Sequence, residues 1–186
     1  MKKKIEIKKK LAHDWFKSLQ EIIASQFLLI ENKASKKNKK KSKFFIKREW
    51  KKENKKEGGG ISYLLNGGEI FDKVGINQST VTGQFEKSFR SKILGAEKNG
   101  KYWASGISVV AHMKNPKIPA FHFNTRFIVT SKAWFGGGMD ATPSLKDKKE
   151  KDFIHQKLKE VCKINNKNYN KYKKWCDNYF YLPHRK

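Results

Sequence analysis

Residues 11–30 carry the hydrophobic spacing of an amphipathic helix. Apolar side chains recur there every three or four positions, at Leu11, Trp15, Leu19, Ile22, Ile23 and Phe27. This period places them on one side of a helix, as in a helix that packs on a larger body. We therefore predict a helix over 11–30. The Lys-rich stretch 33–43 has no apolar period, so we expect a solvated, mobile connection there.

The middle of the chain has the alternation and the turn residues of antiparallel strands. All 13 glycines and three of the four prolines lie within 58–143. Asn66-Gly67-Gly68 tolerates positive φ and separates two short apolar runs, 61–65 and 69–74, which predicts a hairpin. Further strands are predicted at 79–85, 102–113 and 121–130, the last two forming a second antiparallel pair.

The two ends of the chain lack these turn residues and favour helices. Apolar positions predict helices over about 147–163 and from Tyr169 to Phe180. We therefore predict an α+β fold, in which a mainly antiparallel β-sheet is flanked by α-helices in a single domain over 1–186. Its parts are the 11–30 helix, a basic connection and strand over 31–57, the sheet region 58–143 and the helices of 144–186.

Composition adds a large positive charge. Lysine and arginine total 43 against 17 acidic residues in a chain of 186, a formal net charge of +26. Only four of the 43 are arginines, the residue that base and phosphate recognition favours, so a Lys-rich nucleic-acid-binding protein is the weaker interpretation. No apolar run reaches the roughly 20 residues that span a bilayer, and no secretory signal is present, so we expect a cytoplasmic protein. Cys162 and Cys176 form no CxxC pair and are expected to be reduced packing residues.

The predicted strand 121–130 carries the clearest candidate site. Because side chains alternate along a strand, His122, Asn124 and Arg126 share one face. An imidazole, an amide and a guanidinium in a row can hold a carboxylate and move a proton. A wet outer face of the sheet is the simpler alternative. An arginine at this position, in a chain that otherwise uses lysine, favours a site.

Ser108 and His112 share a face of the predicted strand 102–113 in the same way. Pairing of this strand with 121–130 would form one polar wall, with the register left open by the sequence. A metal site is a further alternative, but no spacing motif such as HExxH links the five histidines, and structural histidines are the simpler interpretation. The segment from Trp134 to Asp140 contains three glycines, as where backbone approaches a ligand or a crossing strand.

These stretches resemble the oxygen-dependent coproporphyrinogen III oxidase family of haem biosynthesis over about 58–186. The resemblance rests on ordered motifs, namely Ile70-Phe71-Asp72-Lys73-Val74-Gly75, Ala104-Ser105-Gly106-Ile107-Ser108 to His112, Asn115-Pro116 through Pro119 to His122-Phe123-Asn124-Thr125-Arg126, Trp134 to Asp140 with Thr142-Pro143, Tyr172-Lys173-Lys174-Trp175-Cys176-Asp177, and His184-Arg185.

The resemblance implies oxidative decarboxylation of two propionates of coproporphyrinogen III to vinyl groups, with O₂ as co-substrate, giving protoporphyrinogen IX. It implies no organic cofactor. His122 matches the family position assigned as proton donor, and the positions that match Ser108, Asn124, Thr125 and Arg126 contact substrate. Bacterial members are also credited with a divalent metal on histidines that match His112, His155 and His184.

Two positions depart from the family pattern. Thr82 stands where many members have histidine, and Ala141 stands where leucine is usual, and both changes are expected to enlarge or loosen the pocket. Family members continue beyond the residues that match His184-Arg185 into a part that supplies further substrate contacts and the dimer interface. We therefore expect a chain that is incomplete at its C-terminus and a homodimer at full length. An inactive truncated family member is the alternative function.

Overall fold

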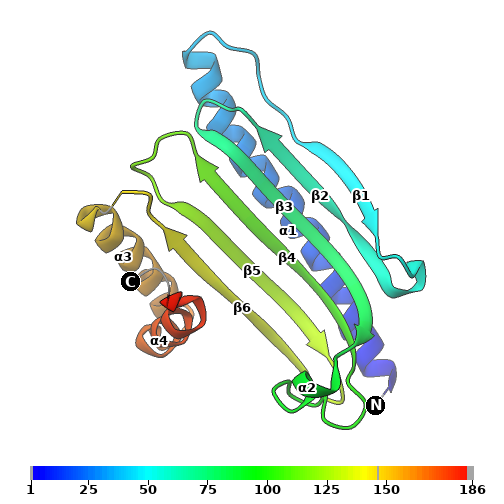
Figure 1. Ribbon diagram of the computed structural model, residues 1–186. Coiled ribbons are helices and arrows are strands. Elements are labelled where there is room, and N and C mark those ends of the chain that lie inside the picture. The colour runs from blue at the N-terminus through cyan, green and yellow to red at the C-terminus, as the bar shows by residue number, and fades with distance from the viewer. Residues whose placement is uncertain (1, 146, 184–186) are drawn as a thin grey trace.

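A computed structural model describes residues 2–145 and 147–183 and has the predicted α+β class (Figure 1). Six antiparallel strands form one sheet whose spatial order, β1-β2-β3-β4-β5-β6, is the order of the chain. The elements are α1 (Lys2–Lys37), β1 (Ile46–Lys51), η1 (Lys55–Glu57), β2 (Gly58–Asn66), β3 (Phe71–Gln84), α2 (Lys87–Arg90), β4 (Lys101–Met113), β5 (Ala120–Val129), β6 (Ala133–Thr142), α3 (Lys148–Ile164) and α4 (Tyr169–Phe180).

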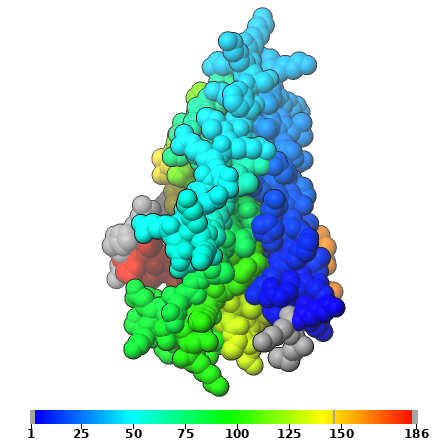
Figure 2. All heavy atoms as spheres, turned by 90° about the vertical axis from the view of Figure 1, so that its right-hand side faces the viewer, coloured from blue at the N-terminus to red at the C-terminus, as the bar shows by residue number. Residues whose placement is uncertain are grey.

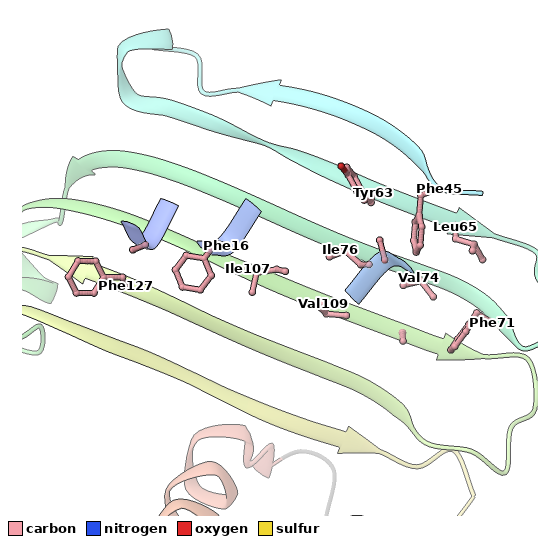
Figure 3. Close-up of a cluster of buried hydrophobic side chains, with 13 residues drawn as sticks. Phe16, Phe45, Tyr63, Leu65, Phe71, Val74, Ile76, Ile107, Val109 and Phe127 are labelled. Carbon is pink, nitrogen blue, oxygen red and sulfur yellow. The ribbon is translucent and has the colours of Figure 1, made fainter. Parts of the chain in front are cut away.

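Helix α1 covers one face of the sheet, where it contacts β3 and β4 and runs along the long axis of the molecule (Figure 2). Phe16 is 1% exposed and packs into a cluster on this face (Figure 3). Besides α1, the cluster contains Phe45, which directly precedes β1, and the sheet side chains Tyr63, Leu65, Phe71, Val74, Ile76, Ile107, Val109, Ala111 and Phe127. Because successive residues of a strand point to opposite faces, the alternate side chains of these strands face away from α1.

The helix at 11–30 is confirmed, but the face predicted to be buried is wrong for half of its residues. Leu11, Trp15 and Ile22 are at least half exposed, and the helix instead approaches the sheet through Ala12, Phe16, Gln20 and Ala24. Small side chains let the helix come close to the sheet. The buried amide of Gln20 donates to the carbonyl oxygens of Ile61 and Ile76, 2.8 and 2.9 Å away.

The hairpin between β2 and β3 is confirmed, with Gly67 at a φ of 60°. Its turn is held by Glu31 of α1, which is fully buried and accepts from the backbone N–H of Glu69 and, at 3.0 Å each, of Ile70 and Phe71. This contact explains why the predicted mobile connection from 33 is wrong as far as Lys37. The helix continues because its last turns reach the hairpin, and Ser35 is buried there as well.

Two strand predictions also need correction. The runs 69–74 and 79–85 belong to one continuous strand, β3, which pairs with β4 along nearly its whole length. The glycine-rich segment after Trp134 is the regular strand β6, paired with β5 from Val129 to Ala120. A Cβ on Gly137 would lie 2.4 Å from the carbonyl oxygen of Asn124, so this strand requires a glycine where the two backbones come close.

The predicted C-terminal helices are α3 and α4, which contact each other, with α4 also packing against β6. Asp147 and Asn168 cap their N-termini through side-chain oxygens that accept backbone N–H groups of the first turn. Cys162 and Cys176 lie in these helices as free, partly buried thiols, as expected. None of the helices in the described ranges is both long and apolar enough to span a bilayer.

Candidate functional site

The polar residues predicted to share a face of β5 lie on the side of the sheet opposite α1. Phe127 and Val129 of β5 join the core under α1, so the alternate residues His122, Asn124 and Arg126 face away from it. Pairing of β4 with β5 is confirmed. The register makes Ser108 the direct partner of Asn124 and thereby joins the two polar sets that the sequence left separate.

Arg126 is exposed on this face, and its Nη2 donates to Oδ1 of Asn124 at 3.1 Å. Asn124 is buried, at 8% exposure, so the pair joins a buried amide to an exposed guanidinium. The strand partners of Arg126 are Gly106 in β4 and Gly136 in β6, neither of which places a side chain beside it. The guanidinium therefore has no neighbouring strand side chain beside it, and the donors that Asn124 does not use can bind an anion.

His122 lies between Val110 of β4 and Asp140 of β6 in the strand register. Direct partners in an antiparallel pair have Cβ atoms about 5 Å apart, so the imidazole and the carboxylate are neighbours on one face. Phe180 of α4 stands edge-on to the imidazole, with ring centroids 6.0 Å apart. Sequence reasoning named Asp140 only as the end of the glycine motif, because its position beside His122 follows from the pairing of β6.

Two predicted residues lie elsewhere. Thr125 is the partner of Ile107 and Gly137, and the strand alternation turns it toward the α1 face, away from Asn124 and Arg126. His112 is exposed near the end of β4, opposite Lys73 and next to a register shift in β3. Neither residue belongs to the row of His122, Asn124 and Arg126, and the substrate role of Thr125 stays a prediction.

A cavity of about 850 Å³ lies beside the site, bounded by β6, α3 and α4. Its lining includes Asp140 and Phe180, which link it to the surroundings of His122, and also both cysteines. His155 lines it too, and its Nδ1 lies 2.7 Å from the Tyr169 hydroxyl. Burial, reinforced by the positive charges of Lys173 and Lys151, lowers the pKa of His155, so its imidazole is neutral at pH 7.

The structure gives no support to the predicted metal site in the part of the chain that it describes. Across residues 2–145 and 147–183, no three His, Cys, Asp or Glu side chains are grouped so that they could hold a metal ion. His112 ends a strand, His155 lies in α3 with one ring nitrogen at the Tyr169 hydroxyl, and His184 falls outside the described residues. His112 and His155, the two donors that the structure describes, do not form a metal centre with other described residues, so no chemical step is derived through one.

Comparison with known proteins identifies the family of the chain. A family model described as Coproporphyrinogen III oxidase matches residues 12–186. The chain belongs to the coproporphyrinogen III oxidase family. It is 47% identical over 179 residues to the oxygen-dependent coproporphyrinogen-III oxidase of Rickettsia akari (strain Hartford), covering 96% of this chain and 63% of that protein.

Two further relatives of the same description cover the same shares of both chains. They come from Rickettsia bellii (strain OSU 85-389) and Rickettsia rickettsii (strain Sheila Smith), each 46% identical over 179 residues. The chain thus spans a little under two thirds of the length of these family members. The match begins in α1, earlier than the resemblance at 58–186 suggested, so the family relationship includes this helix. We call the sheet face that α1 covers the closed face, and the opposite face, which carries His122, Asn124 and Arg126, the open face.

Proposed function

We propose that this chain carries the substrate-binding and proton-transfer face of an oxygen-dependent coproporphyrinogen III oxidase. The observation that carries the proposal is the row of His122, Asn124 and Arg126 on an open sheet face, with Ser108 and Asp140 as its strand partners. Imidazole, amide, guanidinium and hydroxyl groups together suit a substrate whose reacting groups are carboxylates.

Binding follows from charge and from space. Arg126 offers a planar pair of N–H donors to a propionate, and Asn124 and Ser108 add neutral donors beside it. The glycines next to Arg126 leave room for a macrocycle to lie against the sheet. The formal charge of +26 raises the local concentration of a substrate with four carboxylates.

The reaction converts each of two propionates to a vinyl group. A propionic acid side chain and O₂ give the vinyl group, CO₂ and H₂O₂, so the side chain loses CO₂ and two electrons, and O₂ takes up two electrons and two protons. His122 lies where it can move a proton beside the bound propionate, with Asp140 as its direct strand partner. The electron-rich pyrrole can itself react with O₂ while the side chain supplies the two electrons, so orientation and proton transfer are the tasks of the protein.

Other parts of the proposal come from the resemblance. A homodimer at full length and a cytoplasmic location are both expected from family members. The two helices beside the site are compatible with further chain covering it, because α4 exposes Trp175 and Tyr179. No step assigned above to the residues of this chain depends on a metal.

The experiment is O₂-dependent turnover, followed as fluorescent protoporphyrin after oxidation of the product. The chain is assayed alone and as a chimera with the remaining third of the Rickettsia akari relative. Turnover in air and none without O₂, in either protein, supports the proposal. Binding of coproporphyrin III without turnover in both proteins supports the inactive alternative. Absence of both binding and turnover contradicts the assignment of the open face.

A further inference from the structure

Asn124 and its strand partner Ser108 belong to a longer line of polar residues that crosses the sheet. The register continues it across the sheet, because Asn77 of β3 is the direct partner of Ser108, and Ser62 of β2 is the direct partner of Asn77. Ser62, Asn77, Ser108 and Asn124 therefore lie in one line across four strands, all on the face opposite α1. Ser108 and Asn124 were predicted site residues, whereas Ser62 and Asn77 were not.

The side chain of Asn77 is held in one orientation. Its Oδ1 accepts from Nε1 of Trp50 at 3.0 Å and from Oγ of Ser62 at 2.9 Å. An indole N–H can only donate, so the amide atom that it contacts is the oxygen and not the nitrogen. Trp50 and Ser62 thus fix the Nδ2 amino group on the opposite edge of the amide.

This amino group has two N–H donors and no protein acceptor among the described residues. It is accessible to solvent, since every fully buried side-chain nitrogen or oxygen of the described chain has a partner. Asn124 is arranged in the same way: Arg126 donates to its Oδ1, and its amino group has no protein acceptor within the described ranges. Two amides with occupied oxygens and free donors, with a serine hydroxyl between them, form a surface that accepts anions.

We propose that Asn77 is a further substrate-binding residue, which donates from Nδ2 to a second carboxylate of the tetrapyrrole while Arg126 and Asn124 hold the first. Trp50 and Ser62 act as positioning residues. The inference rests on the proposed function, because it takes a substrate with several carboxylates. Neighbouring strands are about 4.8 Å apart, so β3 lies about 10 Å from β5, a span that carboxylates on the rim of one macrocycle can bridge.

The test measures binding and needs no turnover. The probe is coproporphyrin III, a stable fluorescent porphyrin with four propionates, titrated into the 186-residue chain at fixed salt. Asn77→Asp keeps an oxygen for Trp50 and Ser62 but replaces the amino donor with negative charge. Asn99→Asp is the matched control, because it makes the same change at an exposed loop residue whose side-chain oxygen accepts only from the backbone N–H of Lys101.

We expect Asn77→Asp to weaken binding of coproporphyrin III at least about tenfold with an unchanged melting temperature, because it replaces a hydrogen bond to a charged group with repulsion. Asn99→Asp should leave the Kd unchanged. The loss should be smaller for mesoporphyrin IX, which has only two propionates. A merely structural role of Asn77 would lower the melting temperature and would not distinguish the two porphyrins.

Trp50→Phe provides a second variant in case Asn77→Asp destabilises the fold. It keeps an aromatic ring but frees the amide to rotate, so we expect a loss of about threefold that disappears when Asn77 is already aspartate. If the wild-type chain binds coproporphyrin III and both variants have a Kd within twofold of the wild-type value, the role of Asn77 is overturned and the proposed function is not. Failure of the wild-type chain to bind coproporphyrin III overturns the proposed function and this inference with it.

Discussion

The two faces of the sheet are built from the same strands but follow different rules. On the face toward α1, strand positions are filled by apolar side chains, and the polar groups buried there are satisfied within the protein, as Gln20 and Glu31 are. On the opposite face, Asn77, Asn124 and Ser108 keep donors that no described residue uses. The buried polar groups of one face are thus satisfied by the fold, whereas the other face retains hydrogen-bond donors without a partner among the described residues.

Side chains that pack in the core therefore alternate, residue by residue along each strand, with side chains that face away from α1. Neighbours such as Phe127 and Arg126 have separate tasks although they are adjacent in sequence. Substitutions on the closed face should lower the free energy of unfolding and leave ligand contacts intact. Substitutions on the open face should do the reverse.

The largest effect on function without an effect on stability is expected from a substitution of His122. His122→Ala should lower turnover by a factor of about 10² to 10⁴, because a general acid or base is removed, with the Kd for coproporphyrin III nearly unchanged. Turnover of the chimera with the Rickettsia akari segment and equilibrium binding are the two measurements. A melting temperature far below that of wild type would mean that the open face also carries the fold.

Phe16→Ala should give the largest effect on the closed face. Removal of a fully buried phenyl group costs about 3 to 5 kcal/mol of the free energy of unfolding, measured by urea denaturation. Trp15→Ala is the control, because the side chain of Trp15, next to Phe16 in the sequence, is 53% exposed and its removal should cost much less. Equal losses in both variants would contradict the face that the structure assigns to α1.

Glu31→Gln should cost about 1 to 3 kcal/mol at pH 7, since the carboxylate accepts three backbone N–H groups. Burial alone raises the pKa of Glu31, but these donors and Ser35 outweigh burial and lower it from the ordinary value of 4.5. A carboxyl with a lowered folded-state pKa stabilises the fold above its unfolded-state pKa, and the contribution is lost as the pH falls through the folded-state value. The difference between wild type and Glu31→Gln should therefore shrink below about pH 4.5, as followed by urea denaturation at several pH values. A difference that stays constant down to pH 3 would contradict it.

Arg126→Lys should have the smallest of these effects, about a tenfold weaker affinity for coproporphyrin III. The charge is kept but the planar pair of donors is lost, and the exposure of Arg126 limits the energy of the contact. Fluorescence titration measures the change, with Arg90→Lys as control at a residue that bonds the carbonyl oxygen of Phe85, away from the row. Identical affinities of the Arg126→Lys variant and wild type would remove Arg126 from the binding site.

Local periodicity predicts a large part of this fold from the sequence. The long strand ending at Met113, the return strand after Pro119 and both C-terminal helices lie within a few residues of their predicted places. Their residues repeat at a helical or strand period, so the signal is contained in each segment. The shared face of His122, Asn124 and Arg126 was predictable for the same reason.

What the sequence does not contain is the alignment of one segment on another. The pairing of Ser108 with Asn124, and of His122 with Asp140, depends on register, which turns and packing set over long distances. The buried side of α1 was predicted only in part, because Ala12, Gln20 and Ala24 face the sheet together with Phe16, whereas the large apolar residues Leu11, Trp15 and Ile22 are exposed. Strand β6 was missed because its glycines have weak strand propensity and serve close backbone contact with β5.

The strand order has a consequence for the way in which the chain assembles. Every strand pairs with the next one along the chain, so the sheet can grow by short loop closures, one strand at a time. Helix α1 is the exception, since its contact from His13 to Thr80 joins residues 67 positions apart. During synthesis the helix emerges first and has no surface to pack against until β3 and β4 have followed it. Its apolar side therefore has no sheet to pack against while the 76 residues from Asn38 to Met113 are synthesised, and exposed apolar surface of this kind is prone to aggregation.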